Sequence, residues 1–225
     1  MPFDLDAHLS GMRRSVRDGT RDGRPTKVVV VERRFATPPN HLWDAVTRAE
    51  RLGRWFLPVT GDLRLGGRYQ FHGNAGGTIE ACEAPRRVAV TWEYGGEVSW
   101  LDVRIEPDGD GARLVLEHVA PFDAGSPAAE FWSAYGPGAA GAGWDSGFQG
   151  LARHLDDPDA PTPGPDELNA WSASTEGRAF FAAVAAAGGE AAIAAGEAEG
   201  PARAAAERTR AFYTGEAAPD PSSGA

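Results

Sequence analysis

The sequence predicts an α+β protein in which a curved antiparallel sheet packs against one long helix. A valine-rich run at 27–35 is typical of a strand. Strand-like runs separated by glycine turns follow between residues 61 and 120, and an apolar stripe with helical spacing covers 138–155. Because two-residue glycine turns connect antiparallel neighbours, the sheet should be antiparallel.

The strands are expected where apolar and polar residues alternate between turn signals. Doublets such as Gly66-Gly67 and Gly95-Gly96 separate these runs. The predicted strands are 27–35, 62–65, 68–72, 78–83, 87–94, 97–106 and 113–120. Pro38-Pro39 favours a helix start, so short helices are expected at about 38–46 and 49–55.

The predicted helix over 138–155 places large apolar residues on one face, namely Trp144, Phe148, Leu151 and Leu155. A strongly curved sheet cannot close tightly around such a helix. The space between them should form an elongated apolar cavity of the kind that binds small ligands.

The two ends of the chain differ in residue composition and patterning. Leu5, Leu9, Met12 and Val16 recur at helical spacing, which predicts a helix over 4–17 with Asp4 or Asp6 as its N-cap. A polar loop is expected at 18–25. The proline-rich stretch 156–165 predicts a linker, and the alanine-rich remainder predicts short helices divided at Gly188-Gly189 and Gly200-Pro201, with a frayed tail.

These patterns divide the chain into four regions. Residues 1–26 are the N-terminal helix and loop, 27–155 are the sheet-and-helix domain, 156–165 are the linker, and 166–225 are the helical extension. The extension contains few large apolar residues, and those need a surface to cover them. We expect the extension to dock on the same chain; the alternative is a second subunit, which would make the protein a homodimer.

Composition excludes several classes of function. The chain of 225 residues has a net charge of −10 without a basic cluster, which disfavours nucleic acid. No run is long and apolar enough to insert into a membrane, and the start of the chain lacks a secretory pattern, so a cytoplasmic location is expected. The single cysteine excludes an internal disulfide, and no histidines have metal-ligand spacing, so neither a metal nor another cofactor is expected.

Several separated segments resemble one known family in the same order. The run 31–47 is similar to the opening of SRPBCC domains, the START and pollen-allergen-like superfamily, and to its branch named after activators of the heat-shock-protein ATPase. The resemblance continues through Arg54-Trp55-Phe56, 61–69, 85–92, 114–118 and Gly143-Trp144. It covers about 27–155 and implies a helix-grip fold. The family includes ligand carriers, cyclases and co-chaperones, so the resemblance leaves the function open.

Strand alternation indicates which side chains point toward the long helix. The predicted cavity lining is Trp55, Phe56, Tyr69, Phe71, Trp92, Tyr94, His118, Trp144 and Phe148. The alternative is that these residues fill a solid core. His118 is the titratable group on this face, and it either contacts a ligand or is hydrogen-bonded to a neighbouring element.

The leading hypothesis is a non-catalytic module that holds a small hydrophobic or amphipathic molecule, with no catalytic residue assigned. A cyclase or dehydratase that uses His118 as its acid or base is the first alternative. A co-chaperone-like, protein-binding domain is the second.

Overall fold

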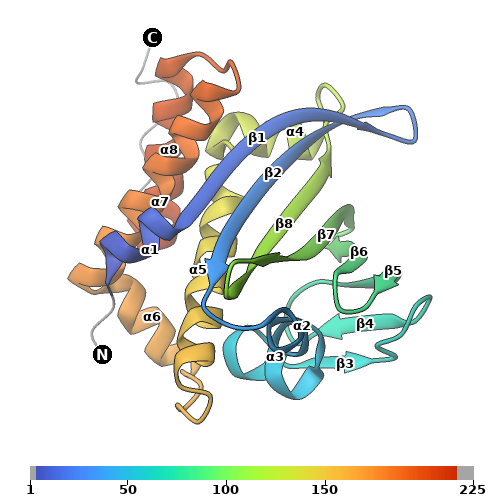
Figure 1. The fold of residues 1–225 in the computed structure, drawn as a ribbon. Helices are drawn as coiled ribbons and strands as arrows, with labels where there is room; N and C mark the ends of the chain where they lie inside the picture. Colours follow the sequence, from blue (N-terminus) through green and yellow to red (C-terminus); the bar gives the residue numbers. More distant parts are fainter. Residues whose placement is uncertain (1–3, 217–225) are drawn as a thin grey trace. The chain divides into compact units, whose positions relative to one another are not determined.

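The structure is a computed structural model that describes residues 4–216 (Figure 1). The chain forms two compact units, each built from separated segments. We call Val30–Pro121 with Ser146–Thr162 the sheet unit, and Met1–Val29 with Phe122–Asp145 and Pro163–Ala225 the helical unit. The chain therefore leaves the helical unit twice, first for most of the sheet and then for the second half of the long helix, and returns each time.

The sheet unit contains two short helices and most of the strands. After the second part of β2 (Arg24–Phe35) come α2 (Pro39–Thr47) and α3 (Ala49–Trp55). The strands that follow are β3 (Val59–Gly61), β4 (Arg68–Phe71), β5 (Gly76–Glu83), β6 (Arg87–Tyr94), β7 (Glu97–Asp108) and β8 (Gly111–Pro121). The second half of α5 (Gly138–Asp156) completes the unit.

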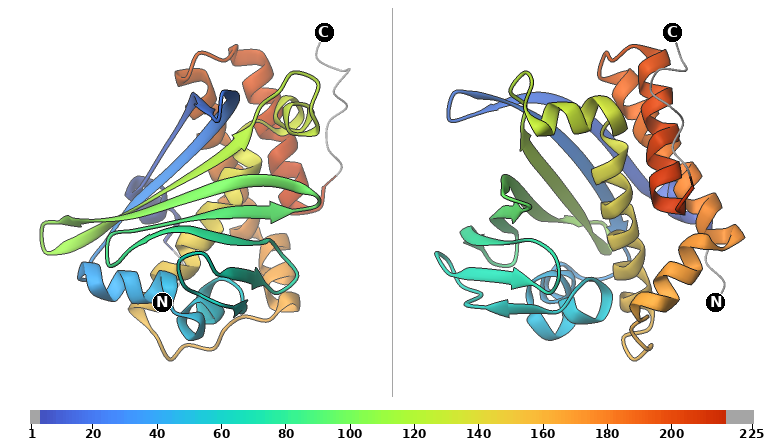
Figure 2. Two further views of the ribbon diagram at one scale, coloured as in Figure 1. Left: turned by 90° about the vertical axis from the view of Figure 1, so that its right-hand side faces the viewer. Right: turned by 180° about the vertical axis from the view of Figure 1, so that it is seen from behind.

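The strands form one eight-stranded sheet in the order β1-β2-β8-β7-β6-β5-β4-β3. Each neighbouring pair from β3 to β8 is antiparallel. The strands bend, and the sheet stays open with β1 (Met12–Arg21) and β3 at its edges (Figures 1 and 2). The predicted α+β, helix-grip class is confirmed.

The helical unit contains α1 (Leu5–Gly11), β1, the start of β2, α4 (Pro127–Tyr135) and the first half of α5. It also contains α6 (Pro165–Ala173), α7 (Thr175–Ala194) and α8 (Glu199–Thr214). Phe180, Phe181 and Val184 of α7 form its buried core together with Ala142 of α5. Trp171 and Tyr213 pack against this cluster from α6 and α8.

The predicted helix over 4–17 is correct for α1 and wrong for the residues after Gly11, which form β1. Asp4 is the N-cap, and its carboxylate accepts a hydrogen bond from the Ala7 amide at 2.9 Å. The predicted loop at 18–25 is reduced to a two-residue turn, because Asp22 and Gly23 adopt φ values of 52° and 78°. Two positive φ values in succession are typical of the type I′ turn that joins hairpin strands.

Two further expectations are wrong. The third strand of the sheet is Val59–Gly61 rather than 62–65, which lies in the connection to β4. Gly188-Gly189 does not divide a helix, because α7 continues through it. A Cβ added at Gly188 would lie 2.8 Å from Gly138 Cα, so this glycine allows α5 and α7 to approach closely instead of ending the helix.

Candidate functional site

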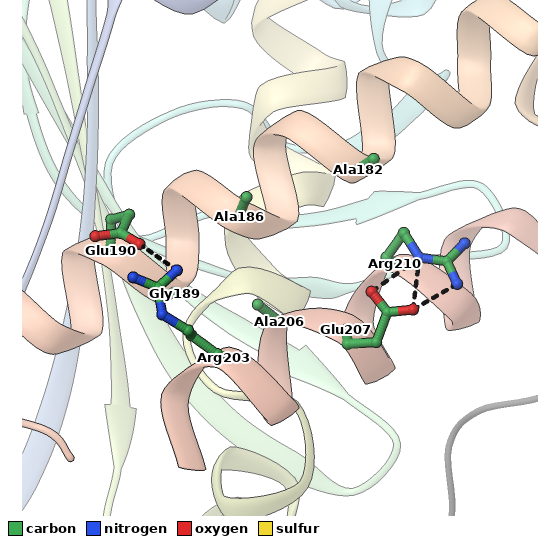
Figure 3. Close-up of a pocket in the computed structure, with 8 residues that line it drawn as sticks. All are labelled: Ala182, Ala186, Gly189, Glu190, Arg203, Ala206, Glu207 and Arg210. Carbon is green, nitrogen blue, oxygen red and sulfur yellow. Dashed lines mark hydrogen bonds and ion pairs between the residues drawn. The ribbon is translucent and has the colours of Figure 1, made fainter. Parts of the chain in front are cut away.

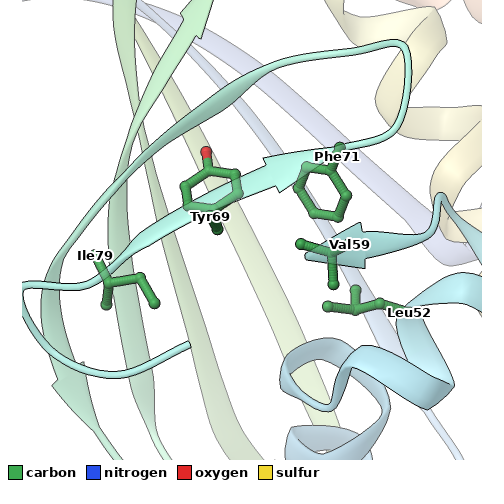
Figure 4. Packing of buried hydrophobic residues seen from close by; sticks show 5 residues of the cluster. All are labelled: Leu52, Val59, Tyr69, Phe71 and Ile79. Carbon is green, nitrogen blue, oxygen red and sulfur yellow. The ribbon is translucent and has the colours of Figure 1, made fainter. Parts of the chain in front are cut away.

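The candidate site is an aromatic cluster in the sheet unit. Its buried layer joins α3 to strands β3, β4 and β5 and consists of Leu52, Val59, Tyr69, Phe71 and Ile79 (Figure 4). The Tyr69 hydroxyl donates a hydrogen bond to the Thr91 carbonyl at 2.7 Å, and burial raises the pKa of this phenol. Tyr69 therefore stays neutral and links β4 to β6 across the intervening strand β5.

A second layer of aromatic rings lies on this buried layer. The Phe56 ring, just after α3, meets the Phe71 ring edge-on at 5.1 Å and lies 6.5 Å from Trp92. Trp55 lies 5.6 Å from Phe56, and its indole N–H donates to the Ala45 carbonyl at 2.9 Å. Trp55, Phe56 and Trp92 remain partly exposed, unlike Tyr69 and Phe71 beneath them.

The strand register extends this face from β6 to β8. Trp92 is paired with Ser99 of β7, and Leu101, two residues further along β7, is paired with His118 of β8. Since directly paired residues and residues two apart project to the same side of a sheet, Trp92, Ser99 and His118 share one face. Trp92 and His118, which alternation predicts on the same side of the sheet, therefore do share one face.

His118 is held in one hydrogen-bonded arrangement. Its Nε2 lies 2.8 Å from Ser99 Oγ, and the Ser99 hydroxyl donates to the Trp92 carbonyl at 3.2 Å. A hydroxyl has one proton to donate, so His118 Nε2–H donates to Ser99 and Nδ1 carries the lone pair. The Trp92 indole meets the imidazole edge-on at 6.5 Å.

The His118 side chain combines deep enclosure with remaining accessibility. Burial lowers the pKa of His118 to about 4, so the imidazole is neutral at pH 7. The residue nevertheless keeps part of its surface exposed.

The second half of α5 covers the same aromatic layer. A Cβ added at Gly147 would lie 3.8 Å from the Phe56 ring, and one at Gly150 would lie 2.5 Å from the Trp55 carbonyl oxygen. Phe148 is buried and lies 6.1 Å from Phe35 of β2. Phe56 thus lies between α5 and the sheet residues Phe71 and Trp92.

A polar contact joins the same two helices at the end of α5. The Arg51 guanidinium donates its Nε–H to His154 Nε2 at 3.1 Å, so that nitrogen carries no proton. Burial and the neighbouring arginines lower the pKa of His154. This hydrogen bond orients α5 over α3.

The structure brings together six of the predicted lining residues, Trp55, Phe56, Tyr69, Phe71, Trp92 and His118, in one contact network, with Phe148 on the helix that covers it. Tyr94 lies apart at the end of β6 and is 61% exposed, because the hairpin after it projects into solvent. Trp144 is partly buried on α5 and falls in the helical unit. The described residues contain no group of histidine, cysteine and carboxylate side chains suited to a metal ion.

Sequence reasoning missed a buried charged cluster in the helical unit. Asp145 of α5 accepts Arg14 Nε–H at 2.9 Å on Oδ2, and its Oδ1 accepts a second hydrogen bond from Arg14 Nη2. His8 Nε2 lies 3.2 Å from the same Oδ1, and the His8 ring packs 5.3 Å from Phe180. We call these three residues the Asp145 cluster. Asp145 is more than 130 residues from both of its partners in the chain, and no local sequence pattern predicts such a pairing.

Comparisons with known proteins identify the family to which the chain belongs. Residues 36–156, more than half of the chain, match the model described as "Activator of Hsp90 ATPase homolog 1-like protein". The chain belongs to this family. The matched segment includes the whole aromatic cluster, whereas α6, α7 and α8 lie beyond it.

Solved structures extend the comparison beyond the matched segment. The solution structure of CalU16 from Micromonospora echinospora is 28% identical, with a TM-score of 0.63 over 81% of this chain and 94% of that chain. Its crystal structure gives a TM-score of 0.56 over 77% and 98%. Protein MLL2253 from Mesorhizobium loti, 24% identical with a TM-score of 0.50 over 59% and 99%, shares the fold. None of the curated proteins matches this sequence.

Among residues 4–216, no helix is both long enough and apolar enough to cross a bilayer.

Proposed function

We propose that the sheet unit is a binding module for a small hydrophobic or amphipathic molecule, held at the aromatic cluster. The observation that carries this proposal is the partial exposure of Phe56, Trp92 and His118 on the sheet face that α3 and α5 cover. In a solid core these rings would be sealed by their neighbours. Accessible rings on a covered face are typical of a ligand recess.

The chemistry of the cluster favours a flat apolar ligand. Aromatic pairs in offset or edge-on contact contribute about 0.5–1.5 kcal/mol each beyond the apolar area that they bury. Phe56, Phe71 and Trp92 already meet one another at angles from 45° to 90°, so a bound ring would find both faces and edges to contact. The imidazole and hydroxyl of His118 and Ser99 supply a polar end for an amphipathic ligand.

The ionisation of His118 favours binding over acid–base catalysis. With its pKa lowered to about 4, the imidazole holds no extra proton at pH 7 that it could donate as an acid. A group with that pKa is also a weak base, whereas efficient general bases have a pKa near the working pH. His118 is therefore better suited to orienting a ligand than to moving a proton.

Fluorescence titration with N-phenyl-1-naphthylamine, a neutral apolar probe, tests the proposal on the intact protein. We expect saturable binding, and Trp92→Leu should weaken it by about tenfold, the equivalent of losing one good aromatic contact. Native mass spectrometry of protein purified without denaturation would show whether a natural ligand is retained.

Trp100→Leu is the matched control. Trp100 is a partly buried tryptophan on β7 that pairs with Thr91 and Val119, so it projects from the face opposite Trp92. This variant should bind the probe like the parent protein. Absence of saturable binding, or an equal loss in both variants when circular dichroism shows both to be folded, would refute the proposal.

A further inference from the structure

A hydrogen-bond chain forms the polar end of the aromatic cluster. His118 Nε2–H donates to Ser99 Oγ at 2.8 Å, and the Ser99 hydroxyl donates onward to the Trp92 carbonyl at 3.2 Å. Both protons therefore point in one direction, from the imidazole toward the backbone of β6. A neutral imidazole and a hydroxyl have one polar proton each, so neither side chain keeps a proton that it could donate to a ligand.

The same chain leaves acceptor capacity on Ser99. A hydroxyl oxygen has two lone pairs, and the hydrogen bond from His118 uses one of them. Among residues 4–216, no other group donates to Ser99 Oγ. Ser99 and His118 are both partly exposed and share the sheet face of Trp92. The serine hydroxyl beside the rings is thus an acceptor for a ligand and not a donor.

A charged ligand is a poor match for this acceptor. A carboxylate is stabilised by donated hydrogen bonds, and Ser99 and His118 supply none. An ammonium group has three N–H protons, and a single acceptor leaves two of them without a partner. The rings of the cluster do not compensate a charge by ionising, because Phe71 and Trp92 do not titrate and burial raises the pKa of Tyr69. Taking an uncompensated charge out of water is costly, whereas a neutral O–H group loses nothing by donating to Ser99.

We propose that the aromatic cluster selects a neutral aromatic ligand that carries a hydrogen-bond donor, such as a phenol, and that Ser99 Oγ accepts this hydrogen bond. The inference rests on the proposed function, because it names the chemistry of the ligand at the same cluster. Ser99 determines the specificity. His118 is a positioning residue, since its N–H fixes the direction of the Ser99 hydroxyl.

The groove between α7 and α8 has the opposite chemistry and provides a control site. It has a volume of about 150 Å³, and none of its lining residues carries an aromatic ring (Figure 3). Its two arginines are each paired with two carboxylates, Arg203 with Glu190 and Glu199, and Arg210 with Glu207 and Glu216. Ala186→Ser alters the floor of this groove and should leave the binding of every aromatic probe unchanged.

Competition between matched naphthalenes tests the selectivity on the intact protein. N-phenyl-1-naphthylamine is bound first, and 1-naphthol, 1-methoxynaphthalene, 1-naphthoate and 1-naphthylmethylammonium are then compared as competitors at pH 7. We expect 1-naphthol to compete about tenfold more strongly than 1-methoxynaphthalene, the upper end of what one net hydrogen bond contributes. The two charged competitors should be weaker than 1-naphthol.

Ser99→Ala removes the acceptor and leaves His118 Nε2–H without its partner, so a donor replaces the acceptor beside the rings. The affinity ratio of 1-naphthol to 1-methoxynaphthalene should fall to about one or below. His118→Leu should also reduce this ratio, whereas His118→Gln, whose amide N–H can donate to Ser99, should retain part of it. A loss of packing alone would weaken both competitors and leave the ratio unchanged.

The outcomes separate this inference from the proposed function. If the probe binds but 1-naphthol competes no better than 1-methoxynaphthalene or a charged competitor, the cluster binds aromatic ligands without this selectivity and the inference is overturned. An unchanged ratio in Ser99→Ala would overturn it as well. Absence of saturable probe binding would refute the proposed function, and this inference with it.

Discussion

The two units of the molecule stabilise their interiors in different ways. In the helical unit, Phe180 is fully buried beside a charged cluster in which Asp145 is held by His8 and Arg14. In the sheet unit, the interior is an aromatic array that ends at a neutral histidine, and several of its rings remain partly exposed. One interior is closed around a charge, and the other is apolar and accessible.

This difference explains which unit is suited to a ligand. A buried carboxylate is tolerated only while each of its partners stays in place, so α1, β1 and α5 are fixed relative to one another around Asp145. Aromatic rings in edge-on contact carry no such requirement and can exchange one apolar neighbour for another. The helical unit is therefore expected to be rigid, and the aromatic interior of the sheet unit is expected to adapt to a ligand.

The largest expected effect is the loss of the buried carboxylate. Asp145→Ala leaves the Arg14 guanidinium without its bidentate partner in a buried site, and breaking such a pair typically costs about 3–5 kcal/mol. Urea denaturation of the variant should show a free energy of unfolding lower by that amount. Asp44→Ala removes an exposed partner of Arg48 and should change the free energy by about 0.5 kcal/mol or less. Equal effects of the two substitutions would contradict the assignment of Asp145 as a buried, structural charge.

The next effect is a dependence of stability on pH that arises in the sheet unit. Burial lowers the pKa of His118 from 6.5 to about 4, so the unfolded chain binds a proton more readily than the folded protein as the pH falls. The contribution of neutral His118 is therefore complete above pH 6.5 and is lost as the pH falls toward 4. The shift corresponds to about 3 kcal/mol, because each pKa unit is worth about 1.4 kcal/mol.

A His118→Gln variant isolates this contribution, since His154 and the carboxylates titrate in both proteins. The free energy of unfolding should fall less between pH 7 and pH 4.5 in the variant than in the parent. Identical pH profiles would mean that His118 is solvated in the folded protein.

The smallest effect concerns the closeness of α5 to α3. A Cβ at Gly150 would lie 2.5 Å from the Trp55 carbonyl oxygen, so Gly150→Ala forces the helix or the end of α3 to move. Overpacking of this kind costs about 1–3 kcal/mol in thermal or urea unfolding. Gly200→Ala lies in α8 where a Cβ meets nothing within 4 Å, and it should be neutral or stabilise by up to about 1 kcal/mol. A destabilisation shared by both variants would point to a general effect of replacing glycine.

Much of the sheet unit could be predicted from local patterns. Alternation along β6 and β8 placed Trp92 and His118 on one face, and the pairing of the strands bears this out. Glycine turns marked the hairpins, and the apolar stripe marked α5. The resemblance to the SRPBCC superfamily then supplied the arrangement of these elements. Alternation fails for Tyr94. It lies two residues after Trp92 and should project to the same side, but it is exposed because β6 leaves the packed region there.

The helical unit was harder to predict from the sequence, for specific physical reasons. Met12 and Val16 are four residues apart, a spacing that places two side chains on the same side of both a helix and a strand, so it could not distinguish β1 from a longer α1. The Asp22-Gly23 pair was a hairpin signal that the polar stretch around it concealed. Helix α4 was missed although Ser126 and Pro127 mark its start, where Ser126 Oγ accepts the Ala129 amide at 3.2 Å.

The helical unit is built from separated segments of the chain, and this determines the order in which its contacts form during folding. Its first strand and first helix pack against α7, and His8 pairs with a residue 137 positions later. Contacts of such high sequence separation form late, because a long loop must close before any of them is gained. During synthesis from the N-terminus, β1 can pair with β2 early, but the contacts of α1 and β1 with α7 must wait for nearly the whole chain. The C-terminal helices are needed to complete a unit that the first residues begin, and truncating them would leave those residues without most of their packing surface.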